Sequence, residues 1–352
     1  MDYLFDIQRL PSFLVPFVSL SYPVERPLLT DSFHDAVHYD IGYLDTCFIV
    51  TLIAMMAILR DVARLFVLEP FARWKLTRDW RLRQGCMVPI TNGKSNGNGA
   101  SNRTGSPTGK SAERLPEDSA EAKHIHRSVL RFAEQGWQTL YYTMQWSYGV
   151  YIYRNVPNML ADPWSNYPHI PLPSVVKGYY LMQIAFYVHA VLIINAEARR
   201  RDHWQMMTHH VITIALVIIS YSYNFTRVGC LIMVIMDWCD ITLTFAKTLR
   251  YLAFQKACDL AFIFFLISWF ITRHVLFIKV ILSTYWDLAR IVPFEWIPER
   301  GHYFSPEVHM TFVVLLTCLQ ILQCIWSYMI FRVAWRVVMG YGADDTRSDE
   351  DA

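Results

Sequence analysis

Four ionisable side chains lie within two apolar stretches that are each long enough to cross a membrane. The first stretch contains adjacent histidines, His209 and His210, and the second contains two aspartates, Asp237 and Asp240. Ionisable groups inside a membrane span are costly, and they usually face a protein interior or a water-filled cavity. Imidazoles beside carboxylates can exchange protons near neutral pH. These residue types therefore predict an intramembrane site for proton transfer.

The two pairs are predicted to lie at the same depth. His209 follows Arg201 by about 12 Å of helix, and Asp240 precedes Lys247 by about 10 Å. The same rise places the other member of each pair at about 13 and 15 Å. The turn between the two helices, residues 220–227 (SYSYNFTR), is short, so the helices are expected to be antiparallel neighbours. The four side chains are therefore expected to form one layer.

Spacing within each pair predicts where the side chains point. Asp237 and Asp240 are three residues apart and share a helix face. His209 and His210 diverge by about 100°, so one can face a substrate while the other meets a carboxylate or a neighbouring helix. Structural hydrogen bonds between the helices are the alternative explanation for all four. No metal site is predicted, because histidine-rich membrane metal centres need repeated His boxes that this chain lacks.

The composition predicts an all-α, polytopic membrane protein. Of its 352 residues, 54% are hydrophobic and only 18% are charged, whereas soluble domains average about a quarter charged. Net charge is +2, and no basic stripe indicates nucleic-acid binding. Apolar runs of about 20 residues recur along the chain. The seven predicted transmembrane helices are 43–60, 136–154, 177–196, 204–222, 228–247, 258–282 and 309–332.

Lys and Arg are concentrated in the loops on one side of these helices, after the first and third spans and near the ends of the fifth and seventh. By the positive-inside rule, the N-terminus is predicted to be lumenal and the C-terminus cytosolic. Residues 90–123, rich in Gly, Ser and Asn, are predicted to form a disordered linker.

The segment from Arg199 to Tyr251 resembles the signature motif of the longevity-assurance ceramide synthases, which carry a TLC domain. Shared features are the Arg-Arg-x-Asp start, the double His, the Asn-Phe-x-Arg-x-Gly turn and the paired Asp. Residues 131–146 (RFAEQGWQTLYYTMQW) and 272–282 (TRHVLFIKVIL) are also similar to family segments. Met236 precedes Asp237 where many animal members have His, which is similar to the fungal branch. The resemblance covers about residues 126–340.

This resemblance divides the chain into four parts. Residues 1–69 would be a lumenal N-terminus with the first transmembrane helix, and 70–125 a basic cytosolic segment with the linker. Residues 126–340 would form the TLC-domain helical bundle, and 341–352 an acidic cytosolic tail. The family works in the endoplasmic reticulum membrane, which is therefore the expected location.

The resemblance implies sphingosine N-acyltransferase activity, in which a fatty acyl-CoA acylates the amine of a sphingoid base. The family's functional residues correspond to His209, His210, Asp237 and Asp240. Acyl-CoA is a substrate, so no cofactor is expected. The other expected partner is the lipid bilayer, and the resemblance leaves open a homodimer and a small single-span accessory subunit. A non-enzymatic TLC-domain lipid sensor or transporter is the alternative function.

Two routes of acyl transfer fit these residues. One imidazole could act as general base, held in its tautomer by Asp237 or Asp240, while the other donates to the oxyanion. Alternatively, a histidine could carry the acyl group as an acyl-imidazole. The acyl tail is expected to run toward the loop 283–308. Arg273 either closes the deep end or, as we expect, extends to the lumenal interface. The CoA phosphates are predicted to bind Arg199, Arg200, Arg201, Lys247 and Arg250.

Overall fold

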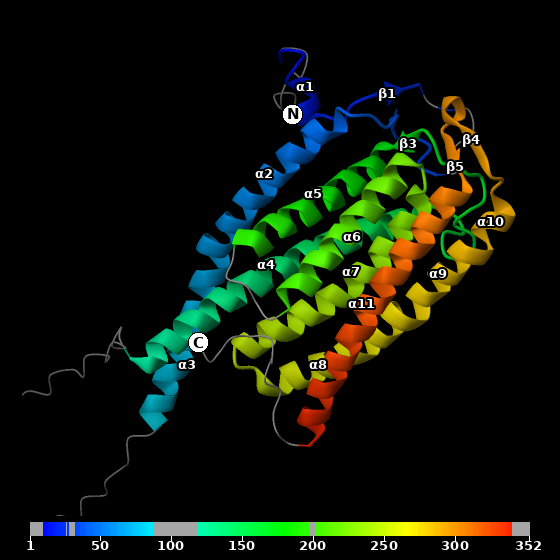
Figure 1. Ribbon diagram of the computed structural model, residues 1–352. Helices are drawn as coiled ribbons and strands as arrows, with labels where there is room; N and C mark the ends of the chain where they lie inside the picture. The colour runs from blue at the N-terminus through cyan, green and yellow to red at the C-terminus, as the bar shows by residue number, and fades with distance from the viewer. Residues whose placement is uncertain (1–9, 26, 28–31, 87–118, 197–201, 340–352) are drawn as a thin grey trace, which may run out of the picture.

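Long helices form a bundle that carries short strands at one end (Figure 1). The computed structural model describes residues 10–25, 27, 32–86, 119–196 and 202–339. We call the end of the bundle with the strands the strand end, and the opposite end the α3 end. The long helices are α2 (Asp45–Ala63), α3 (Glu69–Cys86), α4 (Ala120–Asn155), α5 (Ser174–Ala196), α6 (His203–Ser222), α7 (Thr226–Tyr251), α8 (Gln255–Trp269), α9 (Phe277–Trp286) and α11 (Pro306–Val338).

Two π-helical segments make longer rods out of consecutive helices. The first, Arg64–Leu68, joins α2 to α3, and the second, Phe270–Leu276, joins α8 to α9. A π-turn contains one extra residue, so it rotates the side chains that follow relative to an α-helix. Such turns occur frequently at functional sites. The second π-segment is the one that bears on the site described below.

The prediction of an all-α membrane protein is confirmed. Within the described residues, six helical segments are long and apolar enough to cross a membrane. The predicted span 136–154 is not among the six. It forms the C-terminal part of α4, which packs along α7 and buries polar side chains, among them Gln145. A helix that faces protein needs less apolar surface than one that faces lipid.

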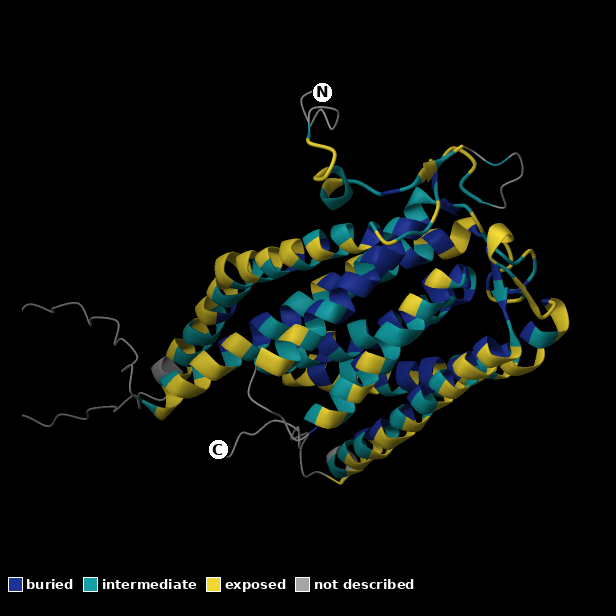
Figure 2. Cartoon of the chain, turned by 45° about the horizontal axis from the view of Figure 1, so that its top comes forward, coloured by how far each residue is buried: buried dark blue, intermediate teal, exposed yellow. Residues whose placement is uncertain are grey.

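Burial separates the inner helices from the outer ones. In the apolar 18-residue stretch of α7, 61% of the residues are buried, against 11% in the corresponding stretch of the rod that α2 begins. Figure 2 shows buried residues in the central helices and exposed residues on the outward faces. Large apolar side chains such as Leu260, Ile263 and Phe270 are exposed on α8 and the π-turn that follows it. An exposed apolar belt of this kind fits contact with lipid.

The helix α4 begins earlier than the sequence indicated. Ser119 caps it by accepting a hydrogen bond from the Ala122 backbone N–H at 3.1 Å. Residues 120–123, which were predicted to belong to the linker, are therefore helical. Residues 90–118 of the predicted linker and the tail 341–352 lie outside the described residues.

The strand end was not predicted from the sequence. The strands β1 (Pro23–Val24), β2 (His38–Tyr39) and β3 (Leu172–Pro173) form an antiparallel sheet, with Pro23 opposite Tyr39. A hairpin of β4 (Glu295–Ile297) and β5 (His302–Phe304) lies beside it (Figure 1). Gly301 in its turn has φ of 67°, which glycine adopts without strain. The short helices are α1 (Val15–Val18), α10 (Leu288–Ile291) and the 3₁₀ turn Pro298–Arg300.

A buried ion pair joins the N-terminal segment to the bundle. Lys177 of α5 is fully buried, and its Nζ lies 2.7 Å from Oδ1 of Asp45 in α2. The same ammonium donates to the backbone carbonyls of Ser21 and Asp40. The Tyr221 hydroxyl of α6 donates to Oδ2 of Asp45 at 2.8 Å. The charge is thus surrounded by oxygen acceptors and closed off from solvent.

Candidate active site

A cavity lies between α5, α6, α7, α9 and α11. Its lining residues recur every three or four positions, so each helix presents one face to it. On α11 the lining residues are Phe312, Leu316, Leu319 and Gln323. Along α6 the lining runs from His209 to Ser220, about 17 Å of helix axis.

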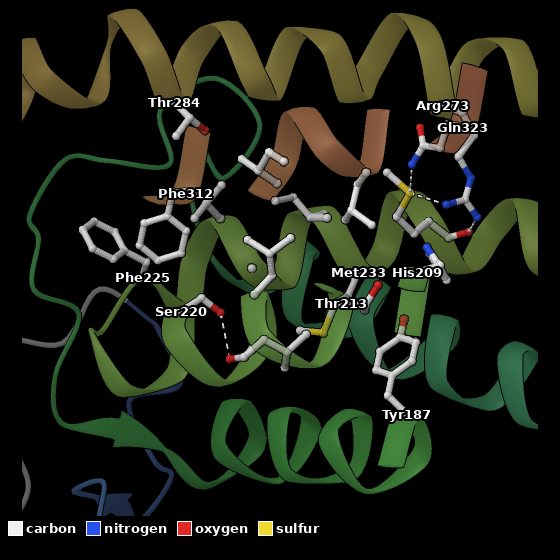
Figure 3. A pocket seen from close by; sticks show the side chains of 18 of the residues that line it. Tyr187, His209, Thr213, Ser220, Phe225, Met233, Arg273, Thr284, Phe312 and Gln323 are labelled. Atoms are coloured by element: carbon white, nitrogen blue, oxygen red, sulfur yellow. Dashed lines mark hydrogen bonds between the residues drawn. The ribbon is translucent and has the colours of Figure 1, made fainter. Parts of the chain in front are cut away.

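The cavity is polar at one end and apolar at the other (Figure 3). His209, Arg273 and Gln323 lie together toward the α3 end, with the Tyr187 and Thr213 hydroxyls nearby. The opposite half is lined almost entirely by apolar side chains. A cavity of this kind fits an elongated molecule with a polar head and an apolar tail.

Aromatic side chains close the cavity at the strand end. Phe312 and Phe225 lie there with ring centroids 5.2 Å apart. Trp164 completes the wall, and its indole N–H donates to the Ser283 hydroxyl at 2.9 Å. The loop that carries Trp164 is pinned by Asp162, and the hydrogen bond from the Ser165 hydroxyl lowers the pKa of that carboxyl. The end wall is therefore held from two sides.

Close helix packing shapes this apolar half as well. Gly229 of α7 lines the cavity, and a Cβ at that position would overlap the hydroxyl of Tyr180 on α5. That hydroxyl donates to the Thr226 carbonyl at 3.1 Å. Glycine therefore allows α5 and α7 to approach closely beside the cavity.

The two histidines point in different directions, as their spacing predicted. Their rings are 5.4 Å apart and almost perpendicular, at 89°. His209 lines the cavity and packs against Trp326 of α11, with ring centroids 5.1 Å apart. His210 is buried outside the cavity lining and faces Tyr187 at 6.2 Å. Only His209 is therefore placed to meet a molecule in the cavity.

The partner of His210 differs from the one expected. Its Nδ1 lies 2.8 Å from the Met206 carbonyl oxygen, which can only accept a hydrogen bond. Nδ1 therefore carries the proton, and a backbone carbonyl holds the tautomer that we had expected an aspartate to hold. Nδ1 of His209 is buried and has no hydrogen-bond partner.

The two aspartates also occupy different environments. Asp240 lines the cavity, and its side chain is 30% exposed. Asp237 is fully buried behind the cavity wall, where Oδ2 accepts a hydrogen bond from Gln183 Nε2 of α5 at 2.7 Å. The predicted layer of four groups thus divides into an inner pair, His209 and Asp240, and an outer pair that does not line the cavity.

Arg273 is a site residue whose position the sequence reasoning misjudged. We expected it to extend to the membrane interface, but it is buried and lines the cavity. One of its terminal nitrogens lies 2.9 Å from Asp240 Oδ1 and 3.1 Å from the Met236 carbonyl. Arg273 sits in the π-turn between α8 and α9. The two charges compensate each other, so the arginine need not reach water.

The two predicted phosphate-binding residues that the structure describes do not line this cavity. Lys247 and Arg250 are half-buried near the C-terminus of α7, at the α3 end. The other three, Arg199, Arg200 and Arg201, lie outside the described residues.

Tyr187 and Gln323 also line the polar end, and sequence reasoning missed both. Gln323 carried a usable signal, because a glutamine in an apolar span needs a polar neighbour. Tyr187 gave none, since tyrosine is common in such helices.

The fold and the site define a polytopic helical membrane protein with a closed intramembrane cavity that ends in an imidazole and an ion pair. Residues 131–332 match the TLC domain, and the chain belongs to the TLC-domain family.

Similar proteins are named as acyltransferases. The chain is 40% identical over 231 residues to the sphingosine N-acyltransferase lag1 of Schizosaccharomyces pombe, covering 63% of this chain and 58% of that protein. It is 36% identical over 254 residues to the ceramide synthase FUM18 of Gibberella moniliformis, covering 64% and 60%. It is 33% identical over 242 residues to the ceramide synthase hyl-2 of Caenorhabditis elegans, covering 67% and 73%. The chain spans less than two thirds of the length of the two fungal relatives.

Proposed function

We propose that this chain is a sphingosine N-acyltransferase, which transfers a fatty acyl group from acyl-CoA to the amine of a sphingoid base. The observation that carries the proposal is the cavity: His209 and Arg273 stand at its polar end (Figure 3), Asp240 pairs with Arg273, and an apolar chamber extends behind them. The names of the similar proteins support the same reaction.

The chemistry requires one proton acceptor near the reacting atoms. The substrate amine arrives mainly as an ammonium ion and must lose a proton before its nitrogen can attack the thioester carbon. The new C–N bond forms as the C–S bond breaks, and the CoA thiolate takes up a proton. The products are the amide, CoA thiol and one released proton. His209 is placed to move these protons, because it is the histidine that lines the cavity.

Direct attack and a covalent route both place His209 at the reacting carbon. In the covalent route its imidazole first displaces CoA and carries the acyl group. Rapid quench with labelled acyl-CoA in the absence of amine separates the two. Labelled His209 supports the covalent route, and unlabelled protein at full activity supports direct attack.

The shape of the cavity assigns the two ends of the acyl-CoA. The acyl tail would occupy the apolar half, closed by Phe225, Phe312 and Trp164. The thioester would lie beside His209, and the charged CoA head would extend toward the α3 end, where it can remain in water. Exclusion of water from the closed half would protect the acyl group from hydrolysis.

Basic residues support an orientation with the α3 end in the cytosol, as acyl-CoA delivery needs. Lys75 and Arg78 lie on α3, and the C-termini of α7 and α11 carry Arg250 and Arg336 at the same end (Figure 1). Positive side chains favour the cytosolic side, so we place the strand end in the lumen of the endoplasmic reticulum. Glycosylation of a sequon engineered into the loop 287–305 tests this placement.

The direct test is an assay of the purified protein with sphinganine and acyl-CoAs of graded chain length, with mass spectrometry of the products. The proposal predicts N-acyl sphinganine from at least one acyl-CoA, formed about 10³-fold more slowly by the His209→Ala variant. Absence of product with every acyl-CoA, from protein that still binds sphinganine, would favour a lipid sensor or transporter instead.

A further inference from the structure

The ion pair at the polar end of the cavity has one unused acceptor. Asp240 Oδ1 is bound by Arg273 at 2.9 Å, and the side chain of Asp240 remains 30% exposed while that of Arg273 is 5% exposed. Both residues line the cavity, and the carboxylate is the more exposed of the two. Two oxygens of a carboxylate offer about four acceptor positions, so Oδ2 is available to a bound molecule.

Such a carboxylate fits a positive ligand group and not a negative one. Asp240 is the acidic residue among those that line the cavity, and a bare carboxylate at this depth is costly unless a cation lies nearby. Arg273 supplies that cation from one side. A second donor on the cavity side would complete the hydrogen bonding of Oδ2.

We propose that Asp240 binds the ammonium group of the amine substrate and so forms an ammonium site. Arg273 is then a positioning residue that holds this carboxylate charged and oriented. The inference rests on the proposed acyltransferase function and adds the location of the amine. In the bound state Oδ2 accepts a hydrogen bond from the ammonium group. In direct attack, the imidazole of His209, which lines the same cavity, then takes the proton whose loss frees the nitrogen lone pair.

A hydrogen-bond network on the outer side of the π-turn fixes Arg273 in this place. The next residue, His274, contacts Ser327 through Nε2 at 2.6 Å and Gln320 through Nδ1 at 3.0 Å, both on α11. Trp269 donates to the same Ser327 hydroxyl at 2.7 Å. These contacts attach the π-turn to α11 while Arg273 points inward.

The ammonium site is tested with substitutions that should change the KM for one substrate and not for the other. Arg273→Gln and Asp240→Asn are each expected to raise the KM for sphinganine about 100-fold, because a charge-assisted hydrogen bond is lost. The KM for acyl-CoA should stay within about 3-fold of wild type, since the acyl chain lies elsewhere in the cavity. Arg273→Lys keeps the charge and should recover at least about 10-fold of the loss. Ile271→Ala, on the exposed face of the same π-turn, serves as the matched control.

Parallel changes in both KM values, or an unchanged KM for sphinganine, would contradict the proposed ammonium site. A second measurement requires no variant: the wild-type protein without acyl-CoA should bind sphinganine at least about 10-fold more tightly than its neutral N-acetyl derivative. Equal or weaker binding of sphinganine would also overturn it. Tight binding of sphinganine without amide formation would instead refute the acyltransferase function and still support the ammonium site.

Discussion

Two buried ion pairs in this protein differ in how completely they are enclosed. At the strand end, Lys177 is fully buried and its partner Asp45 has a side chain only 4% exposed. At the polar end of the cavity, Arg273 is similarly buried, but its partner Asp240 keeps a side chain 30% exposed. The first pair faces only protein, whereas the second faces the cavity.

The difference separates a structural charge from a chemical one. The ammonium of Lys177 is matched by two backbone carbonyls and a carboxylate, so its three N–H donors are all used within the protein and the pair fastens α2 to α5. Asp240 keeps a free oxygen beside an imidazole that also lines the cavity. Burial alone does not mark a functional charge in a membrane protein, and the unused hydrogen-bonding capacity of the buried group does.

The largest expected effect is the loss of activity when the cavity loses the imidazole of His209. His209→Ala should lower the rate of amide formation by about 10³-fold, because no other histidine in the described part of the chain lines the cavity to move the proton. Thermal unfolding should change little. The rate is measured with purified protein, sphinganine and acyl-CoA, and Trp204→Ala on the exposed face of the same helix is the control. Activity within 10-fold of wild type would place the reaction elsewhere.

Substitution in the enclosed Lys177–Asp45 pair should lower stability and leave activity unchanged. Lys177→Met leaves Asp45 buried without its cation and should lower the free energy of unfolding by about 3–5 kcal/mol. Activity per folded molecule should remain, since Lys177 does not line the cavity. Thermal unfolding in detergent, with the exposed Lys279→Met as control, measures the effect. Unchanged stability with lost activity would reverse the roles of the two pairs.

A moderate effect is expected on substrate length when the apolar half is narrowed. Leu316→Trp on α11 projects a larger side chain into the cavity and should shift the product distribution toward shorter acyl chains. The matched control is Val314→Trp, two residues away on the exposed face of the same helix. Product lengths are read by mass spectrometry after competition among acyl-CoAs. An identical distribution in both variants would show that the acyl chain lies outside this cavity.

The smallest effect is expected when the hydrogen-bond network of His274, next to Arg273, is weakened. Gln320→Leu removes one hydrogen bond to His274 and should lower stability by about 1 kcal/mol. The KM for sphinganine should rise only a few-fold, because Ser327 still holds the histidine. Steady-state kinetics measure this change. A loss as large as that of Arg273→Gln would mean that the network, and not the arginine, orients Asp240.

Much of the bundle was predictable from the sequence, because apolar length and helical period are local properties. The ends of most predicted spans lie within a few residues of the observed helices. His209 and Asp240, which were predicted at one depth, both line the cavity, and the 100° offset correctly separated the two histidines. The polar span 136–154 was harder, since α4 gains its burial from α7 and not from lipid.

The inward position of Arg273 could not be read from the sequence. An α-helical register gives no sign of the extra residue in the π-turn, which sets the direction of every side chain there. The same reasoning could not separate Asp237 from Asp240, because two residues on one helix face still differ in which neighbour covers them. Gln183, which covers Asp237, lies 54 positions away in the chain. Long-range packing of this kind decides which polar groups are open.

The central claim is that the acyl chain lies between α6, α7 and α11 with its reacting carbon beside His209. It is tested most directly by determining the structure of the protein with a non-reactive thioether analogue of acyl-CoA. We expect the alkyl chain to extend from His209 toward Phe312 and the sulfur to lie at the polar end near Asp240. An alkyl chain bound on the lipid-facing side of α11, or with its sulfur at the strand end, would contradict the account.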